Sequence, residues 1–190
     1  MSAFSTLTDT ARGERFRLIF AGSGGQGLIT ASIILAEAAV HYERWNAVQT
    51  QVYGPEARGG LSRSDLIISP DEINYPRVTQ PNILVCLSQQ AYDRYAAEIR
   101  PGGLLLIDGG LVSQKPAVDA RQRSFPFHQT VIARLGSAQP ANICMLGALV
   151  AITDIVRFAS LREAVERRFS GAAAAANIEA LELGRLLAGE

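Results

Sequence analysis

The chain has 190 residues, 48% of them hydrophobic, and its 18 basic and 18 acidic residues give a formal net charge of zero. This length is enough to bury the core of one domain. The balanced charge argues against a general nucleic-acid-binding protein and against a polybasic membrane surface. No apolar run reaches the roughly 18 residues that a membrane-spanning helix needs.

The two ends and the two cysteines indicate how the chain is organised. Residues 1–14 are polar and lack the apolar segment of a signal peptide, so we expect a flexible N-terminal tail before a single α/β domain over residues 15–190. Cys86 and Cys144 each lie in an apolar run, which favours buried, reduced thiols and a cytoplasmic location. Two cysteines are too few for an iron–sulfur cluster, which commonly needs four thiolates.

A glycine-rich turn between a strand and a helix organises the domain. The apolar run Arg17 to Ala21 predicts a strand, and Leu28 to Val40, without glycine or proline, predicts a helix. The turn between them consists of Gly22, Ser23, Gly24, Gly25, Gln26 and Gly27. Its first, third and sixth residues satisfy the G-x-G-x-x-G spacing, and strand, turn and helix form the first half of a βαβ unit.

Two interpretations of this turn remain open. Glycines at this spacing let a phosphate approach the backbone, and the amides at a helix N-terminus attract an anion. Glycines also occur wherever a strand turns sharply into a helix, so a purely structural role is the alternative.

The next segment argues against a nicotinamide cofactor. Trp45 to Tyr53 predicts the second strand, where a dinucleotide-binding unit places an acidic residue that holds the ribose hydroxyls. The strand ends without such an acid, and Glu56 comes later, in a loop.

That loop, Tyr53 to Gly60, contains a proline and several glycines and is therefore irregular. Within it, Glu56 and Arg58 form either an ordinary surface pair or part of a site rim, where the guanidinium could bind a carboxylate or phosphate.

The following elements continue an open, mostly parallel sheet with flanking helices. We expect strands at Ser62–Ser69, Asn82–Ser88 and Leu104–Ile107, with an amphipathic helix over Gln89–Ile99 that Ser88 caps. The last two strands and the helix form a second βαβ unit.

The C-terminal third is predicted to be mainly helical. The pattern predicts a loop over Ser113–His128 and a short strand over Thr130–Leu135. It then predicts three helices: the first over Ile143–Phe158, the second from a capping box at Ser160 to Gly171, and the third over Ala172–Leu187. Asn142 is a candidate cap for the first of these helices. Gly147 within it indicates close packing against a neighbour.

Catalytic motifs are not visible. Asp108-Gly109-Gly110 resembles part of a thiamine diphosphate metal motif, but it lacks the preceding glycine and the paired asparagines, so a strand-end turn is the better interpretation. His41 and His128 lie at no metal-ligand spacing.

Several motifs together resemble a known family. These are the turn Gly22–Gly27, the loop Tyr53–Gly60, Leu87–Tyr92, Pro101–Gly103 and Asn142–Leu149. In this order, from about Phe16 to Leu187, they look like the gamma subunit of 2-oxoacid:ferredoxin oxidoreductases.

This resemblance implies a Rossmann-like module of a heteromeric complex. Such complexes decarboxylate a 2-oxoacid to an acyl-CoA using thiamine diphosphate, Mg²⁺, iron–sulfur clusters and coenzyme A, and they reduce ferredoxin. The thiamine and cluster ligands are implied to lie in alpha, beta and ferredoxin-like delta subunits. 2-Oxoglutarate is the first expectation, while pyruvate, branched-chain oxoacids and indolepyruvate stay open.

Carried over to this sequence, the resemblance implies that Gly22, Gly24, Gly25, Gln26, Gly27, Glu56 and Arg58 form a site for a CoA phosphate or a subunit interface. The isolated chain is expected to be inactive, to expose an apolar docking patch, and to be capable of forming a homodimer. Two alternatives are a free-standing nucleotide-binding protein and a non-catalytic scaffold.

Overall fold

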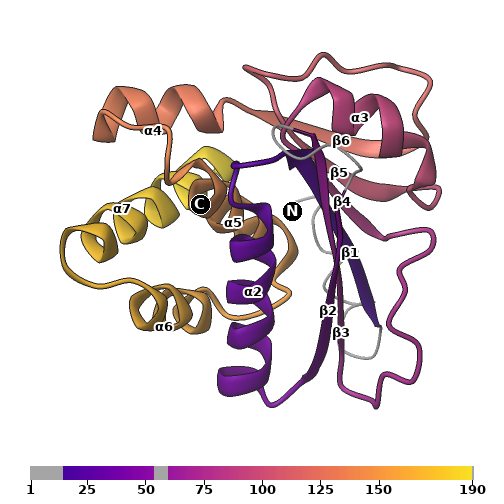
Figure 1. Cartoon of the computed structure of the whole chain (residues 1–190), viewed down its shortest axis with the longest axis horizontal. Coiled ribbons are helices and arrows are strands. Elements are labelled where there is room, and N and C mark those ends of the chain that lie inside the picture. The colour runs from indigo at the N-terminus through magenta and orange to yellow at the C-terminus, as the bar shows by residue number, and fades with distance from the viewer. Residues whose placement is uncertain (1–14, 54–59, 190) are drawn as a thin grey trace.

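The computed structural model describes residues 15–53 and 60–189, which form a six-stranded sheet with helices on both faces (Figure 1). The strands are β1 (Phe16–Ser23), β2 (Asn46–Tyr53), β3 (Leu61–Ser69), β4 (Ile83–Cys86), β5 (Gly103–Asp108) and β6 (Ala120–Phe125). The helices are α2 (Leu28–Glu43), α3 (Gln89–Tyr95), the short 3₁₀ helix η1 (Ala96–Glu98), α4 (Phe127–Leu135), α5 (Ala141–Thr153), α6 (Phe158–Arg168) and α7 (Gly171–Ala188). The predicted tail lies outside the described residues.

The sheet confirms the predicted mostly parallel α/β class. Its strand order is β2-β3-β1-β4-β5-β6. Strands β1, β4, β5 and β6 pair in parallel, and β3 is antiparallel to both of its neighbours. The predicted second βαβ unit is β4-α3-β5, and the Ser88 hydroxyl caps α3 as expected by accepting a hydrogen bond from the Ala91 amide.

The first unit, β1-α2-β2, differs from a simple βαβ unit because β3 is inserted between its two strands. The reason lies in the side chains. Leu66, Ile67 and Ile68 of β3 are buried and alternate between the two faces of the sheet, which suits an interior strand. Strand β2 carries Gln49, Thr50 and Gln51 and lies at the edge, where polar residues are tolerated.

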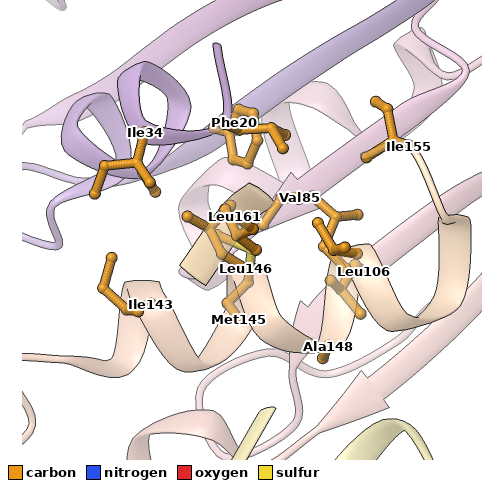
Figure 2. Close-up of a cluster of buried hydrophobic side chains, with 14 of the residues drawn as sticks. Phe20, Ile34, Val85, Leu106, Ile143, Met145, Leu146, Ala148, Ile155 and Leu161 are labelled. Atoms are coloured by element: carbon orange, nitrogen blue, oxygen red, sulfur yellow. The ribbon is translucent and has the colours of Figure 1, made fainter. Parts of the chain in front are cut away.

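The main hydrophobic core lies between the sheet and helices α2, α5 and α6 (Figure 2). Phe20, Val85 and Leu106 from three neighbouring strands meet Ile34 of α2 and Leu146 of α5 there. Helix α2 is apolar on nearly every side because it contacts the sheet on one side and α6 on another. Elements of this same chain therefore cover α2 on more than one side.

Helices α5 and α7 cross at two glycines. A methyl group at Gly147 would collide with the Leu181 carbonyl, and one at Gly184 would collide with the Cys144 carbonyl. The predicted close packing at Gly147 is confirmed, and the two backbones touch because neither position has a side chain.

Two predicted elements in the C-terminal third are wrong. The expected loop over residues 113–128 contains β6. Its polar sequence did not predict a strand because β6 is a half-exposed strand at the sheet edge, which among the described residues pairs with β5 alone. The expected strand over Thr130–Leu135 is part of α4. Phe127 and Val131, four residues apart, are both buried against the core, so tertiary packing decides in favour of a helix.

Two predicted helix caps are also wrong. Asn142 lies inside α5, which begins after Pro140. Ser160 lies inside α6, which begins after Arg157, and the expected capping box does not form. The carboxylate of Glu43, at the end of α2, instead accepts hydrogen bonds from the Arg157 amide and the Ser160 hydroxyl. The cap therefore comes from a residue more than 100 positions away, which no local pattern can reveal.

Candidate functional site

The glycine-rich turn connects the carboxyl end of β1 to α2, as predicted. Gly22 and Ser23 still belong to β1, and Gly27 is the residue that precedes the helix. Gly25 and Gly27 have positive φ angles of 92° and 70°, a left-handed conformation that most other residues avoid. Gly27 also faces the Asn142 side chain, which leaves no room for a Cβ atom.

Gln26 closes the turn with its side chain. Its Oε1 accepts a hydrogen bond of 2.7 Å from the Ser23 amide, and its Nε2 donates one of 2.8 Å to the Leu87 carbonyl. A methyl group at Gly22 would collide with Gln26 Oε1 and with Leu28. The first glycine of the motif therefore makes room for Gln26, which ties the end of β1 to the end of β4.

Part of the backbone of this turn is already engaged. The Gly24 amide donates to the Gly60 carbonyl at 2.9 Å, and the Gln26 amide donates to the Ser23 carbonyl at 3.3 Å. Within residues 15–53 and 60–189, the amides of Gly25, Gly27 and Leu28 have no hydrogen-bond acceptor. These three amides lie at the positive end of the α2 dipole and are free to bind an anion.

A cavity of about 170 Å³ lies beside this turn. It is lined by Gly25, Gln26, Leu87, Asp108, His128, Ala138, Gln139 and Ala141. Gly25 and Gln26 lie between β1 and α2, Leu87 follows β4, and Asp108 ends β5. His128 lies in the first turn of α4, and the other three residues lie just before or at the start of α5. The cavity is thus at the carboxyl edge of the parallel strands, where α/β proteins bind their ligands, and three helix N-termini meet there.

Asp108, in the predicted strand-end turn, has a structural role. Its Oδ1 accepts a hydrogen bond from the Gly110 amide and its Oδ2 one from the His128 amide, both at 2.9 Å. The carboxylate therefore holds the start of α4. Over the part of the chain that the structure describes, no group of three or more His, Cys, Asp or Glu residues could hold a metal ion.

The two cysteines are buried and free, as predicted, and they lie in different core clusters. Burial raises the pKa of both thiols. For Cys144 burial and the nearby charge of Asp108 raise the pKa to about 12. Both thiols are therefore protonated at neutral pH and poor ligands or nucleophiles.

The structure describes some of the predicted site residues and not others. Gly22, Gly24, Gly25, Gln26 and Gly27 lie together, whereas Glu56 and Arg58 lie outside the described residues. Sequence reasoning missed that Asn142, His128 and Gln139 lie beside the turn. For Asn142 a signal existed, because it stands at the beginning of a long apolar helix, but it was interpreted as that helix's own cap.

None of the described helices is long and apolar enough to cross a membrane. An open α/β sheet with a glycine-rich turn between its first strand and the following helix defines a Rossmann-like domain. The ribose-binding acid of NAD proteins is missing from β2. The inserted β3 also moves the end of β2 away from β1 by one further strand spacing, about 4.8 Å.

Comparison with known proteins identifies the family. The model for pyruvate ferredoxin/flavodoxin oxidoreductase matches residues 17–187, and the chain belongs to this family. The 2-oxoglutarate synthase subunit KorC of Methanocaldococcus jannaschii is 47% identical over 153 residues, which cover 80% of this chain and 82% of that protein. The ketoisovalerate oxidoreductase subunit VorA of Methanothermobacter marburgensis is 33% identical over 82% of this chain, which spans 32% of that protein.

A solved structure agrees with these relatives. The gamma subunit of a keto/oxoacid ferredoxin oxidoreductase from Geobacter sulfurreducens superposes with a TM-score of 0.82 at 40% identity, covering 91% of this chain and 98% of that one. The predicted relationship to gamma subunits is confirmed, and so is the predicted fold.

Proposed function

We infer that this chain is the gamma subunit of a 2-oxoglutarate:ferredoxin oxidoreductase. The observation that carries this function is the 47% identity to a 2-oxoglutarate synthase subunit, with about four fifths of both chains aligned. The lower identity to the ketoisovalerate relative, 33%, favours 2-oxoglutarate over a branched-chain oxoacid. Pyruvate and indolepyruvate are the other oxoacids whose turnover is to be compared with that of 2-oxoglutarate.

The redox chemistry of such a complex belongs to its other subunits. Thiamine diphosphate with Mg²⁺ would supply decarboxylation, and iron–sulfur clusters would pass the electrons to ferredoxin. The described residues of this chain do not fit those groups, because the two thiols are buried apart and Asp108 is engaged by backbone amides. This chain is a structural module that takes part in binding at the subunit boundary, with alpha, beta and delta subunits as its partners.

The glycine turn is the proposed binding element of this module. The free amides of Gly25, Gly27 and Leu28, at the N-terminus of α2, would receive either a phosphate of coenzyme A or a carboxylate of a partner subunit. Glu56 and Arg58 are proposed to form the adjacent wall, in the loop that follows β2.

The test is co-expression of this chain with the companion subunits of its own organism, followed by an assay of CoA-dependent dye reduction. We expect activity with 2-oxoglutarate to exceed activity with pyruvate, 2-oxoisovalerate and indolepyruvate, and the isolated chain to be inactive. A complex that prefers another of these oxoacids would contradict the substrate. Failure of the chain to assemble with a thiamine-binding subunit would contradict the function itself.

A further inference from the structure

Within residues 15–53 and 60–189, the β2 side of one sheet face has no helix over it. Parallel α/β sheets are normally covered by helices on both faces. On the face opposite α2, helix α3 packs mainly against β1, and segment 70–82 crosses β3 on its way to β4 (Figure 1). Over the described residues no helix covers the β2 side of this face.

A groove of about 750 Å³ lies in this uncovered region, and we call it the arginine groove. It is lined by Thr50, Arg63, Asp65, residues 76–80, Arg94, Tyr95 and residues 97–99. Thr50 and Asp65 are paired in the middle of their strands, so the groove lies on the face of the sheet. It is therefore separate from the cavity beside the glycine turn.

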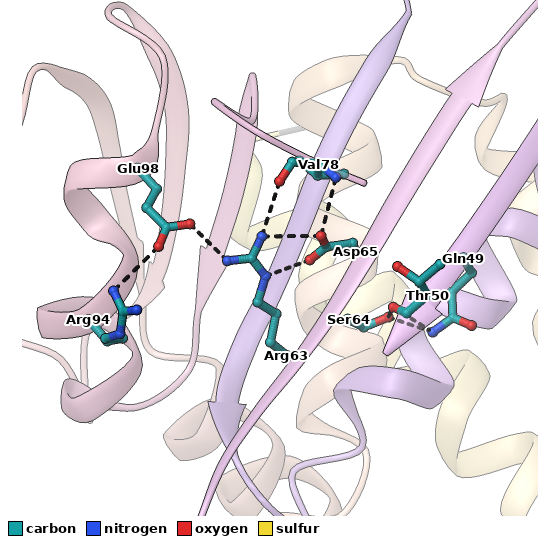
Figure 3. Close-up of polar contacts among 8 residues, drawn as sticks. All are labelled: Gln49, Thr50, Arg63, Ser64, Asp65, Val78, Arg94 and Glu98. Carbon is teal, nitrogen blue, oxygen red and sulfur yellow. Dashed lines mark hydrogen bonds and ion pairs between the residues drawn. The ribbon is translucent and has the colours of Figure 1, made fainter. Parts of the chain in front are cut away.

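Arg63 lies at the centre of the polar contacts that line the groove (Figure 3). Its guanidinium bonds both oxygens of Asp65 at 2.6 and 3.1 Å and Glu98 at 2.8 Å. It also donates to the Val78 carbonyl at 3.2 Å and lies 5.0 Å from the centre of the Tyr95 ring. Both carboxylates that line the groove are thus bonded to this one partly buried arginine.

Two further arginines of the groove carry positive charge that is not fully neutralised by a carboxylate. Arg77 is exposed and, among the described residues, has neither an ion-pair nor a hydrogen-bond partner. The side chain of Arg94 is 65% exposed and lies 3.5 Å from Glu98, whose carboxylate Arg63 already holds at a shorter distance. Among the described residues that line it, the groove therefore has three guanidinium groups and two carboxylates, and the unmatched positive charge belongs to the exposed Arg77 and Arg94.

The residue types at the rim are those of protein interfaces. Tyr75, next to the groove in sequence, is 62% exposed. Tyrosine and arginine are enriched among the residues that dominate binding energy, and guanidinium groups bind carboxylates through two parallel hydrogen bonds. We propose that the arginine groove is the docking site for an acidic segment of a companion subunit, which covers the open half of the sheet and pairs with Arg77 and Arg94.

Charge and position both favour this occupant. A second copy of the chain docked face to face would bring the unmatched arginines of both copies together, which is repulsive. Small ligands of α/β proteins bind at the carboxyl ends of the strands, whereas this groove lies at mid-strand. The proposal rests on the proposed function, because it takes the partner from the same complex.

The experiment compares two double charge reversals in the co-expressed complex. One variant is Arg77→Glu with Arg94→Glu. The matched control is Arg134→Glu with Arg167→Glu, two exposed arginines of α4 and α6 without ion-pair partners among the described residues. Native mass spectrometry and titration of the purified subunits would measure assembly. We expect the groove variant to weaken assembly roughly tenfold or more, the control to change it less than about threefold, and the wild-type affinity to fall as salt rises.

Hydrogen–deuterium exchange of the wild-type chain gives a readout that needs no variant. In the complex, the amides of residues 75–80 should become protected relative to the isolated chain. Equal assembly of the two variants, or unchanged exchange at residues 75–80 in an assembled complex, would overturn the docking site and leave the proposed function intact. If the isolated chain forms a dimer and only the groove variant dissociates it, the groove binds a second copy of this chain. That outcome would overturn the proposal that a companion subunit docks there. If the wild-type chain does not assemble at all, the proposed function fails first.

Discussion

The side-chain amide of Asn142 donates a hydrogen bond of 2.9 Å to the main-chain carbonyl of Gly27. This bond ties the beginning of α5 to the residue that precedes α2, across 115 positions of the sequence. Asn142 is only 7% exposed, so water does not readily replace it. The last residue of the glycine turn is therefore positioned by a side chain from the C-terminal third.

Replacing this amide should destabilise the domain. Asn142→Asp keeps the shape but places a carboxylate oxygen against the Gly27 carbonyl, and we expect a loss of about 2 kcal/mol in the free energy of unfolding. Urea denaturation at pH 7 measures it. The control is Asn177→Asp, whose amide donates to Ala173 on the exposed side of α7 and which should cost less than about 1 kcal/mol. Equal losses at the two positions would contradict the special role of Asn142.

The anion-binding role of the turn can be tested at Gly25. A Cβ atom there would meet no atom of the described residues within 4 Å, and asparagine and aspartate are the residues that tolerate positive φ best after glycine. Gly25→Asn and Gly25→Asp differ only in charge. If the turn binds a CoA phosphate, the aspartate variant should raise the KM for CoA by about tenfold relative to the asparagine variant, a difference of roughly 1.4 kcal/mol.

If the turn instead receives a partner carboxylate, the same pair should differ in assembly of the complex and not in KM. Indistinguishable KM values and assembly for the two variants would contradict an anion site and leave the structural interpretation of the turn.

The crossing of α5 and α7 should not tolerate a methyl group. Gly184→Ala brings a Cβ atom against the Cys144 carbonyl, and a backbone atom cannot move aside as a side chain can. We expect a loss of about 3 kcal/mol or more, at the upper end of overpacking, seen as a lower midpoint of thermal unfolding. The control is Ala175→Val at an exposed position of α7, where helix propensity alone should cost less than about 1 kcal/mol. An unchanged midpoint of thermal unfolding in Gly184→Ala would show that α5 and α7 can move apart without loss of stability.

Glu43 should make stability depend on pH. Its partial burial raises the pKa of the carboxyl group, but the hydrogen bonds from Ser160 and Arg157 lower it more, so the pKa lies below the ordinary 4.5. Because the folded state binds this proton less tightly than the unfolded chain, the contribution of Glu43 is complete above pH 4.5 and is lost as the pH falls through the lowered value.

The corresponding variant is Glu43→Gln. It should be less stable than the wild-type chain by about 1 kcal/mol at pH 7, and the difference should shrink below pH 4. The control, Glu163→Gln, changes an exposed carboxylate of α6 and should show no such dependence. A difference that stays constant with pH would mean that the shape of the side chain, and not its charge, matters.

Much of the fold could be predicted because its signals are local. Apolar runs predict buried elements wherever they occur in a chain, as they do for strands β1, β4 and β5 and for helices α2 and α5. The glycine turn between β1 and α2 was recognisable for the same reason, since positive φ angles and close approach demand glycine at particular positions. The resemblance to gamma subunits rests on such short motifs in a fixed order.

Strands and helices without an apolar run were harder to predict. Strand β6 is polar because it forms an edge, and α4 became helical because Phe127 and Val131 meet the core and Asp108 accepts the His128 amide. Neither environment exists until the sheet has formed. Local propensity is a weak guide at such positions, since burial and cross-chain hydrogen bonds outweigh it.

By itself, the sequence determined the α/β class, the turn at the end of β1, the buried thiols and the family, because periodicity and glycine spacing act over a few residues. Only the tertiary structure decided that β3 separates β1 from β2, and that the Asn142 side chain donates a hydrogen bond to the Gly27 carbonyl. It also decided that Arg63 bonds both carboxylates of the arginine groove. Each of these depends on groups that are distant in the chain and meet only after folding, so their geometry is set by the packing of the whole domain.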